Sequence, residues 1–122
     1  MSDSTASELL QEWTSAVKSG DPKQVTSLYR DDGILLGTFS SKERVGHELI
    51  LEYFENLLKS PVEVQIVSEN PHVLESAAVN TGHYNFVTGG KTINARFSFV
   101  YHKSDAGWKI TSHHSSVIPE AD

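Results

Sequence analysis

The sequence has 122 residues, a length that suits one domain with one hydrophobic core. Hydrophobic residues make up 38% and charged residues 21%, which is enough apolar surface for folding and too little charge for disorder. The net charge of -6 is spread along the chain, so we expect no nucleic-acid partner. The absence of cysteine excludes disulfides and thiolate chemistry. No leader opens the sequence and no apolar run approaches the roughly 18 residues that cross a bilayer, so we expect a cytoplasmic protein without membrane contact.

Two helices are predicted at the start of the chain. Thr5 and Glu8 have the spacing of a capping box, and Gly20 is typical of a helix end. Asp21 and Pro22 then begin a short second helix. The apolar face of the first helix is formed by Ala6, Leu10, Trp13 and Val17.

A turn, a short extended piece and a third helix follow. Residues 31–33 read as a turn, 34–36 as an extended segment and 40–43 as a polar loop. Pro61 ends the third helix. Its wide apolar face is formed by Leu49, Ile50, Tyr53, Phe54, Leu57 and Leu58.

From Val62 onward the apolar period changes to two, and β-branched and aromatic residues dominate. Four strands fit this half, so helices followed by strands predict an α+β fold with an antiparallel sheet. The whole chain, 1–122, is one domain, with flexible ends expected at 1–4 and 119–122. The turns expected between the strands are at Asn70-Pro71, Glu75-Ser76, Gly89-Gly90 and Asp105-Ala106-Gly107.

The Gly89-Gly90 pair predicts a two-residue hairpin turn, which places Gly82 opposite Phe97 and His83 opposite Arg96. One face of this hairpin is apolar, and we expect it to pack on the third helix. Its members are Gly82, Tyr84, Phe86, Ala95, Phe97, Phe99 and Tyr101. The opposite face carries His83, Asn85, Arg96, Ser98 and His102.

Arg96 lies in the middle of a strand, where a charge is costly if the surface around it is dry and unpaired. Either this face is open to water, or a second subunit covers it and supplies a carboxylate. In a twofold dimer that pairing would be made twice.

Other polar residues and two tryptophans have a structural and a functional interpretation each. An isomerase or dehydratase needs a carboxylate base inside the sheet, and Asp31 or Asp32 would have to supply it, although a solvated turn suits them better. Arg44 either is solvated in its polar loop or captures an anion. Trp13 and Trp108 fit core packing better than a ligand pocket.

Several short motifs occur in a fixed order along the chain, beginning with Gly20-Asp21 before the short helix. The others are Tyr53-Phe54-Glu55-Asn56-Leu57, Phe99-Val100-Tyr101-His102-Lys103, Asp105-Ala106-Gly107-Trp108-Lys109 and His113-His114-Ser115-Ser116 with Pro119.

In this combination the sequence resembles the association (hub) domain of calcium/calmodulin-dependent protein kinase II, and its stand-alone microbial versions near the SnoaL-like and ketosteroid isomerase branches. The resemblance implies a nuclear transport factor 2-like cone, in which a curved sheet wraps a long helix, and dimers that build closed rings. The arginines that line the hub cavity of the animal kinases correspond here to Tyr84, Phe99 and Ser115. No Gly-rich phosphate loop accompanies the domain, so we expect no kinase activity.

His113 and His114 are adjacent on a strand and point to opposite faces, so they cannot both ligate one ion, and we expect no metal and no cofactor. Which histidine points inward depends on the length of the loop around the turn at 105–107. A four-residue loop turns Trp108, Ile110 and His114 inward, as hydrophobicity favours, whereas a three-residue loop selects His113 and Ser115, as the family alignment favours. A bulge could reconcile the two. The first alternative is preferred, with His114 in the cavity.

The leading hypothesis is therefore a self-association module that forms dimers and a possible ring of dimers. The rival is a cone that binds a small polar ligand or catalyses a SnoaL-like reaction, and a third is an accessory module that joins hub rings of a kinase. The predicted cavity residues are Tyr53, Tyr84, Phe97, Phe99 and His114. The predicted oligomer-interface residues are His83, Arg96, Ser98 and His102.

Overall fold

The computed structural model describes residues 3–120, and its elements follow the predicted order of helices and then strands, which confirms the α+β class. Of the predicted flexible ends, residues 1–2 and 121–122 lie outside the described range, and Ser4 belongs to the first helix. The elements are α1 (Ser4–Ser19), α2 (Pro22–Thr26), β1 (Tyr29–Leu36), β2 (Glu43–Val45), α3 (His47–Leu57), β3 (Glu63–Leu74), β4 (Ala77–Thr88), β5 (Lys91–Ser104) and β6 (Gly107–Val117).

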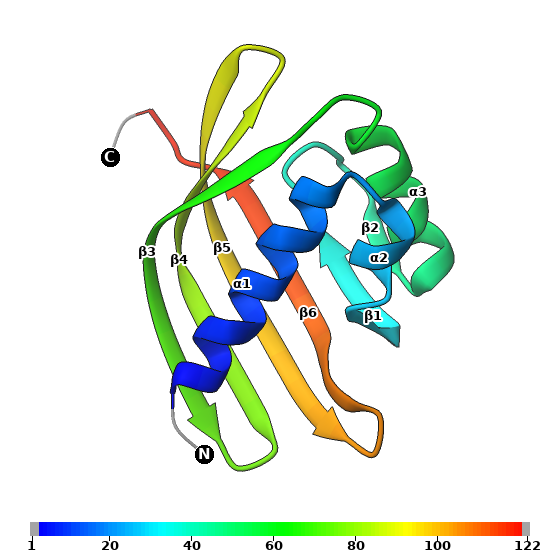
Figure 1. Ribbon diagram of the computed structural model, residues 1–122, viewed down its shortest axis with the longest axis vertical. Helices are drawn as coiled ribbons and strands as arrows, with labels where there is room; N and C mark the ends of the chain where they lie inside the picture. Colours follow the sequence, from blue (N-terminus) through cyan, green and yellow to red (C-terminus); the bar gives the residue numbers. More distant parts are fainter. Residues whose placement is uncertain (1–2, 121–122) are drawn as a thin grey trace.

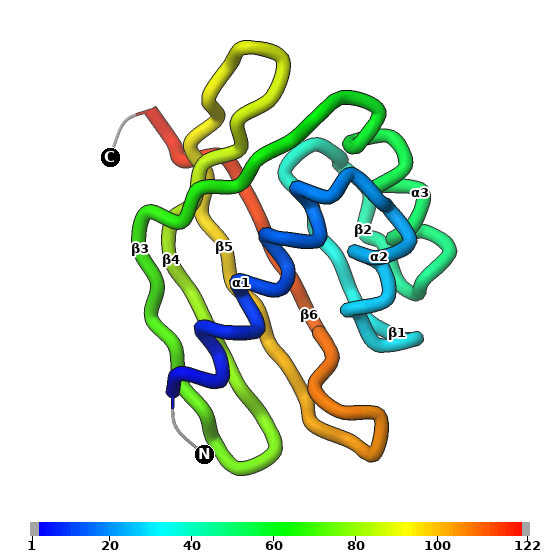
Figure 2. Tube along the Cα trace, in the orientation of Figure 1, coloured from blue at the N-terminus to red at the C-terminus, as the bar shows by residue number. Residues whose placement is uncertain are grey.

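The strands form one six-stranded sheet in the order β2-β1-β6-β5-β4-β3, which curves around α1 (Figure 1). All neighbours are antiparallel except β1 and β6, which run parallel. The β4–β5 register is the predicted one, with Gly82 opposite Phe97 and His83 opposite Arg96. The tube in Figure 2 shows how far the β4–β5 hairpin extends beyond the other strands.

The apolar concave face of the sheet is filled by α1, and the prediction that α3 would cover it is wrong. Trp13 stacks on Tyr84 at a ring-centroid distance of 5.8 Å and meets Phe99 edge-on at 5.2 Å. The 16 residues of α1 span about 24 Å, which suits strands of 12 and 14 residues better than the 11-residue α3 does. The shorter α3 packs beside α2 and β1, where Phe54 contacts Tyr29.

Two local predictions at the start and in the edge strand are wrong. The helix begins at Ser4, one residue before Thr5, so Thr5 cannot cap it, and the N-cap residue Asp3 instead accepts a hydrogen bond from the Val73 amide at 3.0 Å. The expected break at Asn70-Pro71 lies inside β3. Proline is tolerated there because β3 is an edge strand, whose outer amides pair with no neighbour.

Two β-bulges also change the expected chain path. The 31–33 segment is part of β1, where the register against β6 shifts between Tyr29 and Ile34. In β3 the register shifts between Ile66 and Ser68, so the following residues exchange faces. Gly82 permits this second bulge, because a Cβ there would lie 2.1 Å from the Ser68 carbonyl oxygen.

Among the helices of the described residues, none is long and apolar enough to cross a membrane.

We predict that Gly82→Ala lowers the free energy of unfolding by about 3 kcal/mol, since the added methyl group overlaps backbone atoms of the bulge. Gly89→Ala is the matched control: it has a positive φ of 58° but open space around the Cβ position, and should cost about 1 kcal/mol. Urea unfolding of both variants measures the difference. Equal losses would show that the bulge does not depend on the missing side chain.

Candidate functional site

A chain of hydrogen-bonded side chains runs through the interior between α1 and the sheet. Trp13 Nε1 donates to the Tyr29 hydroxyl at 3.2 Å, and that hydroxyl lies 2.8 Å from His113 Nδ1. On the other side of the imidazole, Nε2 lies 3.1 Å from the Tyr84 hydroxyl. Tyr84 donates in turn to Ser115 Oγ at 2.5 Å. These groups come from α1, β1, β4 and β6, so the chain ties four elements together.

The direction of these bonds fixes the tautomer of His113. Because Tyr84 donates its only proton to Ser115, it must accept from His113 Nε2–H. His113 Nδ1 is then the acceptor for the Tyr29 hydroxyl proton. Ser115 Oγ continues the chain to the hydroxyl of Thr38, in the half-buried loop after β1. Every donor from Trp13 to Tyr84 thus has an acceptor.

Aromatic rings enclose the imidazole and keep it neutral. His113 stacks on Phe99 at a centroid distance of 3.8 Å and meets Trp13 edge-on at 5.1 Å. Burial, with a smaller contribution from His114, lowers the pKa of His113 to about 3. Burial also raises the pKa of the Tyr84 hydroxyl. Both groups therefore carry no charge at neutral pH, and the interior is a polar but uncharged network.

The remaining predicted cavity residues on the helix and strands also point inward. Phe97 is 3% exposed and packs against Tyr84 at 4.6 Å between centroids. Tyr53 is 6% exposed, accepts a hydrogen bond from the Phe39 amide at 3.3 Å, and has its pKa raised to about 12 by burial. These buried side chains fill the space that they were expected to line.

The predicted inward orientation of His114 is wrong, because a bulge interrupts the β5–β6 pairing. Tyr101 pairs with Ile110 and Val100 with Ser112, so Thr111 is an extra residue. Ile110 and His113 are therefore both buried, although they are three positions apart. His114 lies on the exposed face.

Arg44 is neither solvated nor free to capture an anion. Its side chain is 6% exposed and donates to the Leu49 carbonyl at 2.8 Å and to Glu52 at 2.9 Å. The guanidinium also lies 5.6 Å from the centre of the Tyr53 ring. Arg44 therefore fastens β2 to α3.

A carboxylate that the alternating pattern concealed lies on the inner side of β3. The bulge turns Glu69 toward the concave face, opposite Gly82, where it is half-buried. Its Oε1 accepts from Ser7 Oγ at 2.8 Å and from Asn80 Nδ2 at 3.1 Å. A glycine inside a strand, as Gly82 is, was the available signal for this bulge. Asp31 and Asp32, the other candidate bases, are exposed and lie outside the interior.

The predicted interface residues lie together on the outer face of the sheet. His83, Arg96 and Ser98 are exposed, and His102 is half-buried. Arg96 and His83 line a hollow of about 370 Å³ that His114 also borders. Within residues 3–120, Arg96 forms no ion pair and no side-chain hydrogen bond.

An apolar row crosses the same outer face. Val45 of β2 pairs with Ile34 of β1, which pairs with Ser112 of β6 and, through it, with Val100 of β5. Val45, Ile34 and Val100 are 51%, 36% and 36% exposed. The outer face therefore combines an unpaired cation with an apolar strip, both open to solvent in the isolated chain.

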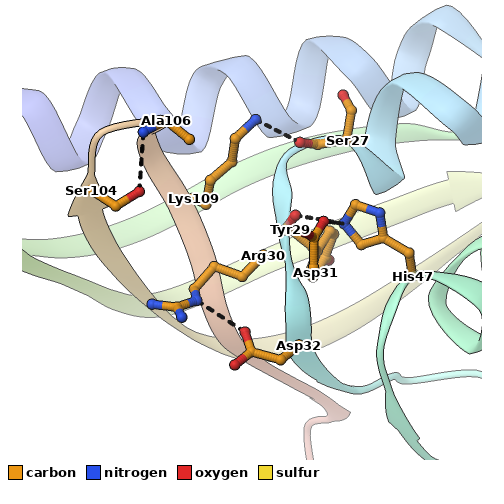
Figure 3. Close-up of a pocket in the computed structure, with 9 residues that line it drawn as sticks. All are labelled: Ser27, Tyr29, Arg30, Asp31, Asp32, His47, Ser104, Ala106 and Lys109. Atoms are coloured by element: carbon orange, nitrogen blue, oxygen red, sulfur yellow. Dashed lines mark hydrogen bonds and ion pairs between the residues drawn. The ribbon is translucent and has the colours of Figure 1, made fainter.

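A separate pocket of about 500 Å³ opens beside the bulge of β1 (Figure 3). Side chains of both charges border it, namely Arg30, Asp31, Asp32 and Lys109, and Arg30 is ion-paired with Asp32 at 3.0 Å. His47, at the start of α3, forms a further wall. In the described part of the chain, no group of three or more His, Cys, Asp or Glu side chains is arranged to hold a metal ion.

Comparison with known proteins assigns the fold and the family. Residues 6–120 match the model of the SnoaL-like domain family, and the chain belongs to that family. Two solved structures that are under 25% identical share the fold alone. One is a nuclear transport factor 2-like superfamily protein of Salmonella enterica, with 19% identity and a TM-score of 0.83 over 98% of this chain and 93% of that one. The other is a provisionally named ketosteroid isomerase of Parabacteroides distasonis, with 22% identity and a TM-score of 0.79 over 93% of this chain and 87% of that one. The fold is thus the nuclear transport factor 2-like cone that the sequence predicted.

A third solved structure is more similar in sequence. It is a protein of Xanthomonas campestris that is 37% identical and has a TM-score of 0.89. The match covers 94% of this chain and 86% of the Xanthomonas chain. That protein is provisionally named a calcium/calmodulin-dependent protein kinase II association domain.

We predict that acid destabilises the protein through His113. The unfolded histidine binds a proton near pH 6.5, whereas the folded one does so only near pH 3, so the stability that this residue contributes is present above pH 6.5 and is lost as pH falls. The expected loss is about 1.4 kcal/mol per pH unit between those values.

Urea unfolding at pH 7, 6 and 5 tests this dependence. His113→Gln should flatten it, whereas His114→Gln, which changes the neighbouring exposed residue, should leave the His113 contribution in place. If the free energy of unfolding of His113→Gln still falls with pH as steeply as in the wild type, the acid sensitivity belongs to another group.

Proposed function

We propose that the protein is a self-association module that dimerises through the outer face of its sheet. The observation that carries the proposal is Arg96, a cation on this face with no partner among the described residues. On the same face, four residues further along β5, Val100 begins the exposed apolar row that continues to Ile34 and Val45. A surface of this composition is suited to being covered by protein.

Self-association accounts for both features of the face at once. Burying the apolar row removes hydrocarbon from water, which stabilises a complex by roughly 25 cal/mol per Å². Arg96 would then need a carboxylate, because a buried unpaired charge is costly. A twofold dimer supplies this pair twice from one complementary contact, and the chain has 16 acidic residues from which to draw it.

The 37% identical relative supports the same function, since its provisional name is that of an association domain. By that analogy dimers of this chain would build into a larger ring through contacts outside the sheet face. Fold alone does not carry function, so the weight of the proposal rests on the composition of the face.

A catalytic cone is the less favoured function, because the interior has little to offer a substrate. Trp13, Tyr84, Phe99 and His113 occupy the space and contact one another. Glu69, the carboxylate on the inner side, already accepts two hydrogen bonds. The same contacts disfavour a small polar ligand in the cone.

We expect light scattering at micromolar concentration to give a mass of at least twice the 13.5 kDa of one chain. Arg96→Ala should shift the equilibrium toward the monomer by about tenfold or more in the dissociation constant, because its partner's carboxylate is left unpaired. Lys18→Ala, which removes an exposed cation from α1, is the control and should leave the mass unchanged. A wild-type protein that is strictly monomeric under these conditions would end the proposal.

A negative charge introduced into the apolar row provides a second test. Val100→Glu should abolish association, since the carboxylate would be buried against hydrocarbon in the dimer. Circular dichroism should show an intact fold, because Val100 faces outward in the monomer. Leu49→Glu, at a residue of α3 that is 38% exposed and lies off the sheet, controls for added charge and should associate normally.

A further inference from the structure

Glu43 is a carboxylate on the outer face of the sheet that, like Arg96, has no partner within residues 3–120. It lies on β2 and pairs with Leu36 of β1, while its neighbour Arg44 turns inward and is buried. Glu43 is exposed, and among the described residues it forms no ion pair and no side-chain hydrogen bond. The same face therefore presents an anion and a cation, each without a partner in the isolated chain.

Three of the five carboxylates on the strands are unsuitable as partners for Arg96. Glu69 faces inward, and Asp32 is ion-paired with Arg30 at 3.0 Å. Asp31 lies on the bulge of β1, at the opposite end of β6 from Arg96. The two that remain are on the edge strands of the sheet, Glu43 on β2 and Glu63 on β3.

The strand register gives the position of Glu43 relative to Arg96. Glu43 pairs with Leu36, Leu36 with His114, and His114 with Ser98. These four residues therefore form one row across β2, β1, β6 and β5. Arg96 lies two residues before Ser98, which is about 7 Å along β5.

The apolar row lies next to this row, two residues away on each of the same four strands. It runs from Val45 through Ile34 and Ser112 to Val100. Both rows extend from β2 to β5, so the middle of each is the boundary between β1 and β6.

A twofold axis above this boundary makes the face complementary to itself. The axis lies between two facing sheets and runs parallel to their strands, so it places β5 on the partner's β2 and β6 on the partner's β1. Val100 then meets the partner's Val45, and Ser98 meets the partner's Glu43. The strands of the two sheets run in similar directions, as in aligned sheet packing.

We propose that the dimer has this axis and that the partner's Glu43 is the carboxylate that binds Arg96. The inference rests on the proposed self-association and specifies its contacts. Arg96 starts about 7 Å from the point on β5 that faces the partner's Glu43, a distance that its long side chain can span. The symmetry makes this ion pair twice, once at each side of the buried apolar row.

The other edge carboxylate, Glu63, does not fit the apolar row. An axis that brought the partner's Glu63 to Arg96 would lie near β4, midway between β3 and β5. The strands β1 and β2 would then extend past the edge of the partner's sheet. Ile34 and Val45 would stay exposed to water, so this axis satisfies the charge and leaves the hydrocarbon unburied.

Exchanging the two charges tests the pair. Arg96→Glu and Glu43→Arg should each raise the dissociation constant of the dimer about tenfold or more, because each brings like charges together twice. The double variant restores the pair in reverse, so its dissociation constant should return to within about threefold of the wild-type value. Sedimentation equilibrium measures all four proteins, and circular dichroism checks their fold.

Glu63→Arg is the matched control, since it makes the same change of charge on the other edge strand. Alone it should leave the dissociation constant unchanged, and combined with Arg96→Glu it should not restore association. Equal rescue by Glu63→Arg would show an effect of net charge and overturn the pair, as would a Glu43→Arg variant that dimerises like the wild type. A wild-type protein that is monomeric would instead refute self-association itself.

Discussion

The central constraint in this structure is the burial of His113 with both ring nitrogens occupied. A neutral imidazole offers one donor and one acceptor, and the surrounding rings leave no water to satisfy them. Tyr29 and Tyr84 must therefore present their hydroxyls at opposite ends of the ring. Trp13 binds the far side of Tyr29, so α1 can dock on the sheet in only one position along its axis.

The same constraint is an argument for seeking the function outside the cone. Trp13, Tyr84 and Phe99 pack around His113 on the concave face, and Glu69, the carboxylate on that side, accepts two hydrogen bonds at Oε1. Arg96, a cation with no partner among residues 3–120, lies on the outer face instead.

The sequence predicted the regular parts of the fold, because periodicity and turn residues act over a few positions. The glycine pair at 89–90 gave the correct register of β4 and β5, and with it the face of Arg96. The errors fall at the bulges: His114 was placed inside, and Glu69 went unrecognised as an inner residue. One inserted residue moves every later side chain of the strand to the opposite face of the sheet, and the amino-acid composition does not reveal it. Arg44 is a different case, since its burial depends on the α3 backbone and on Glu52, eight residues away.

The three bulges differ in how the polar side chains that they place find partners. The bulge of β6 turns His113 inward, where both nitrogens are bonded, and the bulge of β3 does the same for Glu69, which Ser7 and Asn80 bind. His113 has both ring nitrogens hydrogen-bonded, whereas both bonds to Glu69 fall on Oε1. The bulge of β1 turns its carboxylates outward, where Asp32 pairs with Arg30 at 3.0 Å and the Asp31 side chain is fully exposed. A polar group that a bulge turns inward therefore needs partners from neighbouring elements, whereas one that a bulge turns outward can be satisfied by water.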